Sequence, residues 1–287
     1  MSLLQINEPG QKREKVNIEN DPCIGIDFGT TNCVCSVVVK KKLNLIPDEF
    51  GKTYIPSVVS LNNNKFKVGN QVDMILTNNL DDYIYSVKRL FVGDPYEKTI
   101  VLMDGLKISP IEVASYIFKY LKQCCDNYLK KDVKKCVITV PAYFDDKSRS
   151  AIRNSAKLAG FNVLRLINEP TAAAYAYGLE KNTRGTFFVY DLGGGTFDVS
   201  ILKLTDGVFK VLATGGDSNL GGDDFDNNFA KKLLKYNFDL NLGEFDQKQQ
   251  IVISRQCKSF KEKLTKVDNF EDFILIDNQK KKVEDNK

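Results

Sequence analysis

Two segments far apart in the chain share a pattern that constrains the fold more than any other feature. Residues 24–39 (IGIDFGTTNCVCSVVV) and 188–204 (FVYDLGGGTFDVSILKL) each contain an apolar run, an aspartate, a Gly/Thr turn and a second apolar run. Glycine lets the backbone double back, so each segment is predicted to be a hairpin whose aspartate, Asp27 or Asp191, ends a buried strand. Turns of this kind point backbone N–H groups outward, where they can hold phosphate oxygens.

The duplication predicts one phosphate site built from two turns. The two aspartates can then lie on either side of a Mg²⁺ ion that keeps most of its waters. Other nucleotide fingerprints are missing, because no G-x-x-x-x-G-K-[ST] loop occurs and the glycines at 193–195 precede a strand rather than a helix. Taken alone, either segment is also compatible with an ordinary hairpin turn.

Composition indicates a globular protein. A length of 287 residues with 43% apolar content suggests about two domains with substantial cores. The net charge is only +4 and the basic residues are scattered, which argues against a nucleic acid or a membrane as partner. No apolar stretch reaches the length of a membrane span, and the N-terminal residues have charges and a proline where a signal peptide needs an apolar run. We therefore expect a cytoplasmic location.

The residue types that are present limit the possible chemistry. Histidine is absent, which excludes Ser-His-Asp and Cys-His catalysis and every histidine-ligated metal site. Catalysis would have to come from carboxylates, lysines and hydroxyls. The seven cysteines include no C-x-x-C pair, and in a chain without an export signal they are expected to be reduced core residues. Cys33 and Cys35 would share one face of a strand.

Apolar periodicity and turn residues predict alternating strands and helices, the pattern of an α/β protein. The expected helices span residues 110–129, 146–159, 170–179, 224–236 and 247–264. The expected strands after the first hairpin span residues 136–140, 163–167, 186–189, 196–204 and 208–213. Ser109 is placed to cap the first helix, Gly178 is expected near the end of the third, and residues 279–287 form a charged run expected to be frayed.

Longer motifs carry a resemblance to a known family. The segments IGIDFGTTN, NEPTAAAYAYGL and DLGGGTFDVSIL resemble signatures of the seventy-kilodalton heat-shock (Hsp70) chaperones, and VITVPAYFDDKSRSAIRNSAKLAGF and ATGGDSNLGGDDFDNNFA extend the match over nearly the whole chain from residue 23. The resemblance implies an actin-like ATPase fold with duplicated ribonuclease-H-like halves. It divides the chain into a polar arm (residues 1–21), a nucleotide-binding lobe I (22–190) and a partial lobe II (191–287).

The resemblance also implies roles for individual residues. Lys88, in SVKRLF, would stand beside the attacking water and Glu169 opposite it, with Asp191 and Thr196 completing the catalytic group. Without the surrounding motif, Lys88 is also compatible with a surface lysine and Glu169 with a helix N-terminal carboxylate. The implied ligands of Mg²⁺, its waters and K⁺ are Asp27, Asp191 and Asp198. The implied contacts to ATP or ADP are Gly29, Thr30, Thr31, Asn32, Gly193, Gly194, Gly195, Gly221, Gly222, Lys261 and Thr265. Pro141 and Arg149 match residues that pass the nucleotide state to a substrate-binding domain.

The function implied is that of an ATP-driven chaperone that hydrolyses ATP to ADP and phosphate. The segments MSLLQINEPG, VLRLINEP and GDSNLGGDDFD resemble most the bacterial branch of the family dedicated to iron–sulfur protein maturation, which implies a J-domain co-chaperone and an iron–sulfur scaffold protein as client. The family's third signature, Gly-Gly-x-Thr-Arg-x-Pro, and its substrate-binding domain do not occur in these 287 residues, so we expect an incomplete ATPase domain whose own activity is doubtful. A general folding chaperone, a non-hydrolysing nucleotide-binding fragment, a small-molecule kinase and an actin-like filament former remain alternatives.

Overall fold

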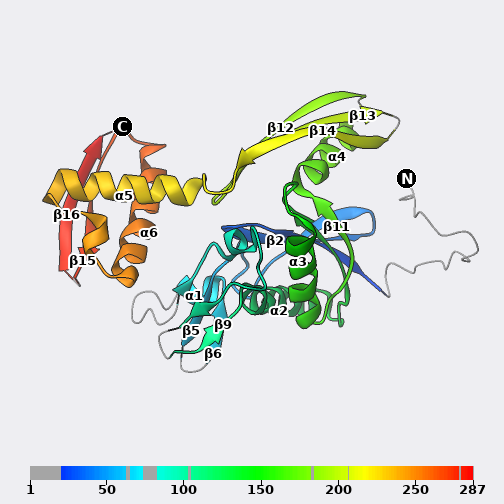
Figure 1. Cartoon of the computed structure of the whole chain (residues 1–287), viewed down its shortest axis with the longest axis horizontal. Coiled ribbons are helices and arrows are strands. Elements are labelled where there is room, and N and C mark those ends of the chain that lie inside the picture. The colour runs from blue at the N-terminus through cyan, green and yellow to red at the C-terminus, as the bar shows by residue number, and fades with distance from the viewer. Residues whose placement is uncertain are drawn as a thin grey trace, which may run out of the picture.

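The computed structural model describes residues 21–62, 65–73, 83–102, 105–181, 184–205, 207–277 and 279–286. All but the last residue of the predicted polar arm lie outside these ranges. The chain is a mixed α/β structure with several sheets, arranged as a sheet-and-helix body, a three-stranded sheet and a C-terminal pair of helices with a hairpin (Figure 1).

The largest sheet contains the first Asp hairpin at its centre. Its strands run in the order β11 (Asn162–Asn168), β10 (Lys135–Val140), β1 (Cys23–Phe28), β2 (Asn32–Val39) and β3 (Lys42–Ile46), with β4 (Ile55–Pro56) also on β2. β1, β10 and β11 are parallel, whereas β1, β2 and β3 form antiparallel hairpins. Alternate residues of β1 point into the core, as expected for a sheet strand.

Two helices pack against this sheet, α2 (Pro110–Leu129) and α3 (Asp146–Leu158). α2 has the bounds that its sequence predicts, because the Ser109 hydroxyl accepts a hydrogen bond from the Glu112 amide while the Glu112 carboxylate accepts one from the Ser109 amide. Phe118 of α2 stacks on Phe28 of β1 with 4.9 Å between ring centroids. Cys33 and Cys35 are fully buried in this core, as predicted.

Several shorter elements lie next to α2. They are β5 (Val59–Asn62), β6 (Lys65–Val68), α1 (Asn70–Asp73), β7 (Tyr83–Ile84), the 3₁₀ helix η1 (Val87–Phe91), β8 (Ile100–Val101) and β9 (Lys107–Ile108). η1 matters for function because it holds the predicted catalytic lysine.

The second Asp hairpin forms a separate antiparallel sheet, β12 (Gly185–Leu192), β13 (Phe197–Thr205) and β14 (Val208–Asp217). Helix α4 (Glu169–Lys181) crosses one face of it. The sequence predicts that this helix ends near Gly178, and it ends three residues later, at Lys181. A Cβ atom at Gly178 would lie 3.1 Å from Leu204 and 3.2 Å from Phe209, so the glycine also lets the helix approach the sheet closely.

The C-terminal part has a core of its own. Helices α5 (Gly222–Phe238) and α6 (Gln247–Leu264), the short η2 (Leu242–Glu244) and the hairpin β15 (Asn269–Ile276) and β16 (Gln279–Asn286) enclose it. The frayed end expected at 279–287 is therefore wrong for residues 279–286. Val283 is fully buried, and Lys282 pairs with Glu271 across the hairpin at 2.9 Å, so the charged residues occupy the solvent side of a strand.

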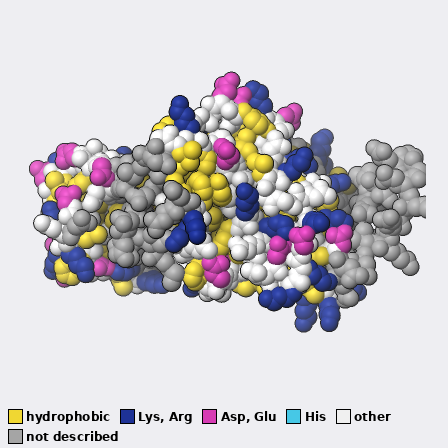
Figure 2. Space-filling model, turned by 90° about the horizontal axis from the view of Figure 1, so that it is seen from below, with side chains coloured by type: hydrophobic (Ala, Val, Ile, Leu, Met, Phe, Trp, Pro, Cys, Tyr) yellow, Lys and Arg dark blue, Asp and Glu magenta, His cyan; other side chains and the backbone are white. Residues whose placement is uncertain are grey.

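The surface is mixed in charge. On the face shown in Figure 2, basic and acidic side chains are intermingled. Among the helices in the described ranges, none is both long and apolar enough to span a bilayer.

Candidate functional site

The two Gly/Thr turns meet in space, as the duplication predicts. One turn joins β1 to β2 and the other joins β12 to β13. A methyl group added to Gly194 would lie 1.5 Å from the Thr31 hydroxyl oxygen, and one added to Gly195 would lie 2.1 Å from the Thr30 methyl carbon. Contact this close between a side chain and a backbone is possible only with glycine, so the second turn is shaped to receive the first.

The N-terminus of α5 is bound to the same glycine turn. The Gly222 amide donates to the Gly193 carbonyl at 3.0 Å, and the Asp223 amide donates to the Gly194 carbonyl at 2.7 Å. A methyl group on Gly221 would lie 2.6 Å from the Gly194 backbone. The structure therefore brings three groups of predicted nucleotide contacts together, residues 29–32, 193–195 and 221–222.

The predicted catalytic pair is formed. The Lys88 ammonium, on η1, lies 2.6 Å from the Glu169 carboxylate at the start of α4, and these side chains are only 4% and 15% exposed. Burial raises the pKa of Glu169, the charge and hydrogen bond of Lys88 oppose the rise, and the carboxylates of Asp27 and Asp198 add to it. The effect of both aspartates on this carboxyl indicates that they lie near the pair.

The three predicted metal-binding aspartates occupy the strand ends beside the turns. Asp27 accepts a hydrogen bond from the Thr139 hydroxyl at 2.9 Å, and Asp191 is directly opposite Asp198 in the β12–β13 ladder. Burial raises the pKa of Asp198, the Thr196 hydroxyl opposes the rise, and the Asp191 carboxylate adds to it. These hard oxygen donors, with two carboxylates of like charge close together, fit a divalent cation such as Mg²⁺. Within the ranges listed above, however, no three acidic or cysteine side chains converge on one point, so the fit is to a hydrated ion rather than to direct coordination by all three aspartates.

Several residues at the site were not predicted from the sequence. Arg89 donates to the Gly195 carbonyl at 2.7 Å and pairs with the Asp224 carboxylate, and the Ser86 hydroxyl donates to the Asp223 carboxylate at 2.5 Å. These bonds join η1 to the glycine turn and to α5. The sequence signal that could have identified Arg89 as a site residue is its position next to Lys88 in SVKRLF.

Tyr143 is a further residue that sequence reasoning missed. Burial raises its pKa, the carboxylates of Asp198 and Glu169 add to the rise, and a hydrogen bond with Thr196 opposes it. These influences place its hydroxyl on the side of the second turn and of the Lys88–Glu169 pair. It follows the predicted relay proline by two residues.

The two predicted relay residues touch each other. Arg149 donates to the carbonyl of Phe144 at 2.8 Å and of Pro141 at 3.4 Å, and to the Asn168 side-chain oxygen at 2.7 Å. Because Asn168 directly precedes Glu169, this network leads to the Lys88–Glu169 pair. Arg149 also borders a surface hollow of about 520 Å³ lined by Asp146, Arg149, Ser150, Arg153, Leu164, Arg165 and Leu166.

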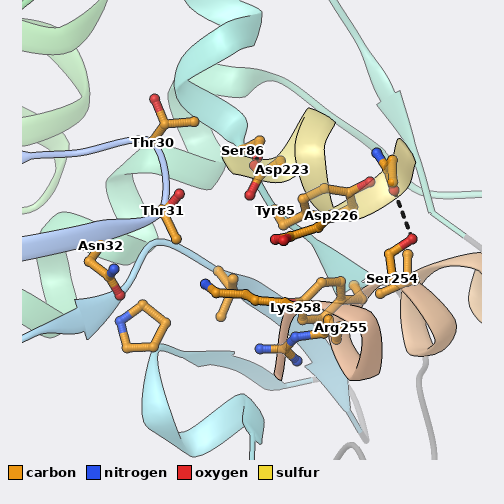
Figure 3. A pocket seen from close by; sticks show the side chains of 15 residues that line it. Thr30, Thr31, Asn32, Tyr85, Ser86, Asp223, Asp226, Ser254, Arg255 and Lys258 are labelled. Atoms are coloured by element: carbon orange, nitrogen blue, oxygen red, sulfur yellow. Dashed lines mark hydrogen bonds between the residues drawn. The ribbon is translucent and has the colours of Figure 1, made fainter. Parts of the chain in front are cut away.

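A pocket of about 250 Å³ lies between the first turn and the C-terminal helices (Figure 3). Its walls come from the turn, from β4 and β7 with the residues that follow each of them, and from α5 and α6. The lining residues are Thr30, Thr31, Asn32, Pro56, Val58, Tyr83, Tyr85, Ser86, Asp223, Asp226, Asn227, Ile251, Ser254, Arg255 and Lys258.

The structure does not bring the remaining two predicted nucleotide contacts into this pocket. Lys261 pairs with Asp226 at 2.5 Å, and Thr265 lies exposed at the C-terminal end of α6 with its hydroxyl donating to the Glu262 carbonyl. The part of α6 that faces the first turn is one to three helical turns earlier, at residues 251–258.

Comparison with known proteins gives a consistent result. The family model described as "Hsp70 protein" matches residues 23–285. Similar curated proteins are named "Chaperone protein HscA homolog": one from Herminiimonas arsenicoxydans is 43% identical over 90% of this chain and 44% of its own length. One from Rickettsia bellii is 39% identical over 97% of this chain and 47% of its own. One from Pseudomonas aeruginosa is 42% identical over 92% of this chain and 45% of its own.

The chain thus spans slightly less than half the length of these relatives. Its match to the family model covers nearly every residue that the structure describes, including both turns and the buried Lys–Glu pair. The chain belongs to the Hsp70 family.

Proposed function

We propose that this chain is the nucleotide-binding portion of an Hsp70 chaperone that acts in iron–sulfur protein maturation, and that its site binds ATP and hydrolyses it to ADP and phosphate. The observation that carries the proposal is the convergence of two Asp-Gly/Thr turns beside the buried pair of Lys88 and Glu169. Phosphoryl transfer requires mainly positioning and charge neutralisation, and these are what backbone amides, hydroxyls and a fixed ammonium group supply.

Each part of the site has a role in this reaction. The turns would hold phosphate oxygens through their amides and through the hydroxyls of Thr30, Thr31 and Thr196. Lys88 would place its positive charge next to the attacking water. Glu169 fixes that ammonium group at 2.6 Å and would orient the water as an acceptor. Arg89 would keep the second turn in place, through its bond to the Gly195 carbonyl.

Mg²⁺ fits the site as a hydrated ion, and Asp27, Asp191 and Asp198 are the residues that would hold it through water, with K⁺ as a second candidate ion. When bound, the metal would neutralise charge on the phosphate chain. The carboxylates themselves would accept hydrogen bonds from its waters. The raised pKa of Asp198 supports this role, because a buried carboxyl beside another carboxylate is stabilised in its charged form by a nearby cation.

The matching geometry of the two Asp hairpins also supports an actin-like, duplicated fold with lobe I at residues 22–190 and part of lobe II at 191–287. β1 pairs with β2 and β12 with β13 in the same antiparallel manner, and each pair ends in a turn of the site.

We also propose that the contact between Pro141 and Arg149 would transmit the nucleotide state of the site to a substrate-binding domain.

The more specific role rests on the resemblance of individual segments and on the names of the relatives. We propose a J-domain protein as co-chaperone and an iron–sulfur scaffold protein as client, acting in the cytoplasm. A general protein-folding role within the same family is the alternative.

An ATPase assay tests the proposal. The chain should bind Mg-ATP, and any release of phosphate should fall by on the order of a hundredfold or more in Lys88→Ala without loss of binding. If the chain bound no nucleotide by calorimetry, the proposed function would be wrong. If it bound Mg-ATP but released phosphate no faster than Lys88→Ala, it would be a non-hydrolysing nucleotide-binding protein.

A further inference from the structure

The first turn of α3 contacts both of the segments that supply the Lys88–Glu169 pair. Arg149 donates to the residue directly before Glu169. The residue before it on α3, Ser148, reaches the other segment, because its hydroxyl oxygen lies 2.6 Å from the carbonyl oxygen of Phe91, the last residue of η1. None of these residues lines the pocket of Figure 3, and the roles proposed above do not use Ser148.

The Ser148 hydroxyl is buried between two acceptors. The side chain is 1% exposed, and the hydroxyl oxygen is also 2.6 Å from the Asp145 carboxylate. That carboxylate already accepts the Ser148 amide at 2.8 Å, as the cap of α3. The Phe91 carbonyl accepts a hydrogen bond from no other group in the described part of the chain. Loss of the hydroxyl would therefore leave a buried carbonyl without a donor.

This carbonyl is one end of a very short helix. η1 has five residues, and 3₁₀ helices of this length are weakly held by their own hydrogen bonds. The start of η1 is attached to α5 and to the second turn through Ser86 and Arg89. The Ser148 hydroxyl attaches the other end to α3. The place of the Lys88 ammonium group depends on both attachments.

Two other side chains of α3 contact the segment that follows η1. Lys147 pairs with Asp94 at 2.5 Å, and the Asn154 amide donates to the Tyr96 hydroxyl at 2.8 Å. Lys147 is 65% exposed, and an ion pair that open to solvent contributes little. Of these three contacts, the one made by Ser148 is buried, so it is the one that we expect to hold η1 in place.

We propose that Ser148 is a positioning residue for the Lys88 ammonium group. Its hydroxyl fixes η1 against α3 through the Phe91 carbonyl, and this keeps the ammonium group beside Glu169; its effect on ATP hydrolysis rests on the proposed function. Because Ser148 and Arg149 are adjacent, one helical turn fixes both partners of the pair. A displacement of α3 would then act on Lys88 as well as on the carboxylate.

Amine labelling tests the placement of Lys88 without relying on hydrolysis. Lys88 is 4% exposed, so acetic anhydride should modify it slowly in the parent chain without nucleotide. In Ser148→Ala, peptide mass spectrometry should find it modified faster by on the order of tenfold, because η1 opens more often. Lys122, 15% exposed on α2, should react at the same rate in both chains. Ser150→Ala, the same change at an exposed position of α3, is the matched control and should label as the parent does.

Turnover supplies a second readout, which a merely structural role would not reproduce. If Ser148 acts through Lys88, Ser148→Ala should lower kcat for Mg-ATP by on the order of tenfold and leave Mg-ATP affinity within about twofold of the parent. In a Lys88→Ala background the same change should have no further effect on kcat, because the group that it positions is gone.

Three results would overturn the inference: equal labelling of Lys88 in Ser148→Ala and the parent, equal acceleration at Lys122, which indicates global destabilisation, or an additive loss of kcat in the double variant. The readouts also separate the inference from the proposed function. Faster labelling of Lys88 alone, in a chain that does not bind Mg-ATP, would support the positioning role and contradict the nucleotide function. Unchanged labelling in a chain that hydrolyses Mg-ATP would do the reverse.

Discussion

The Lys88 ammonium lies 2.6 Å from the Glu169 carboxylate, although the two residues are separated by 81 positions in the chain and both are largely removed from solvent. A buried ion pair contributes little to net stability, because desolvation of both charges offsets their attraction. Retention of such a pair beside the two Gly/Thr turns proposed to bind phosphate is therefore better explained by chemistry than by folding.

The first prediction concerns catalysis by this lysine. A fixed cation beside the attacking water acts mainly in the transition state, so Lys88→Ala should lower ATP turnover by on the order of a hundredfold or more and change Mg-ATP affinity little. Turnover and calorimetric affinity should be measured together on the same preparation. Lys232→Ala serves as a surface control. Turnover within a few fold of the parent would remove Lys88 from the mechanism.

The second prediction concerns pH. The pKa of Glu169 is raised above its ordinary value of 4.5, chiefly by burial. The folded state therefore binds a proton more tightly than the unfolded state, and the stabilisation from this group is complete below pH 4.5 and is lost as the pH rises through the folded pKa. In Glu169→Gln, which cannot ionise, this loss should be absent.

Chemical denaturation without Mg²⁺ checks the sign of this pH dependence, because it measures the free energy of unfolding at each pH. The free energy of unfolding of Glu169→Gln, relative to the parent, should increase as the pH is raised from about 4 to 8. A difference that stays constant over this range, or that decreases, would contradict the raised pKa.

The third prediction concerns the contact between the turns. Gly194→Ala places a methyl group 1.5 Å from the Thr31 hydroxyl and should separate the two turns, so Mg-ATP affinity should fall by at least tenfold. Gly215→Ala is the matched control, because a methyl group there meets nothing within 4 Å. If both variants bound Mg-ATP as the parent does, the turns would not form one site.

Sequence and structure agree best where the residues that determine an element lie within that element or next to it. α2 begins and ends as predicted because a capping box fixes its start and an apolar stripe fixes its buried face. α6 likewise starts at an aspartate cap, Asp246, with its bounds as predicted. The predicted site glycines are brought together because only glycine tolerates the contacts that they make.

Signals that depend on distant partners were not readable from the sequence. β16 is a strand because the residues of β15 lie opposite it and bury Val283, which a charged run does not suggest by itself. Gly178 lies within α4 because the helix meets Leu204 and Phe209 there. The position of Lys261 is determined by Asp226, which lies on a different helix.

The fourth prediction concerns self-association. The face of the β12–β14 sheet opposite α4 exposes Phe188 at 65% and Tyr190 at 61%, and β12 and β14 are edge strands of their sheet. Apolar faces and open edges favour pairing with other chains. The weight-average molar mass of the chain, measured by light scattering, should therefore rise above that of the monomer as the concentration increases.

The variant Phe188→Ser/Tyr190→Ser should reduce this scattering. Tyr236→Ser, which changes a residue 76% exposed on α5, should not. A parent chain that stays monomeric at high concentration would contradict the prediction, as would equal effects of the two changes.

Hydrogen–deuterium exchange with and without Mg-ATP tests the central claim most directly, because it reports on the backbone amides of both turns at once. If the two Asp-Gly/Thr turns form one phosphate site, Mg-ATP should slow exchange at residues 29–32 and 193–196 together, and tripolyphosphate with Mg²⁺ should protect the same amides. Protection of one turn alone, or binding of Mg-ATP with both turns unchanged, would contradict the account.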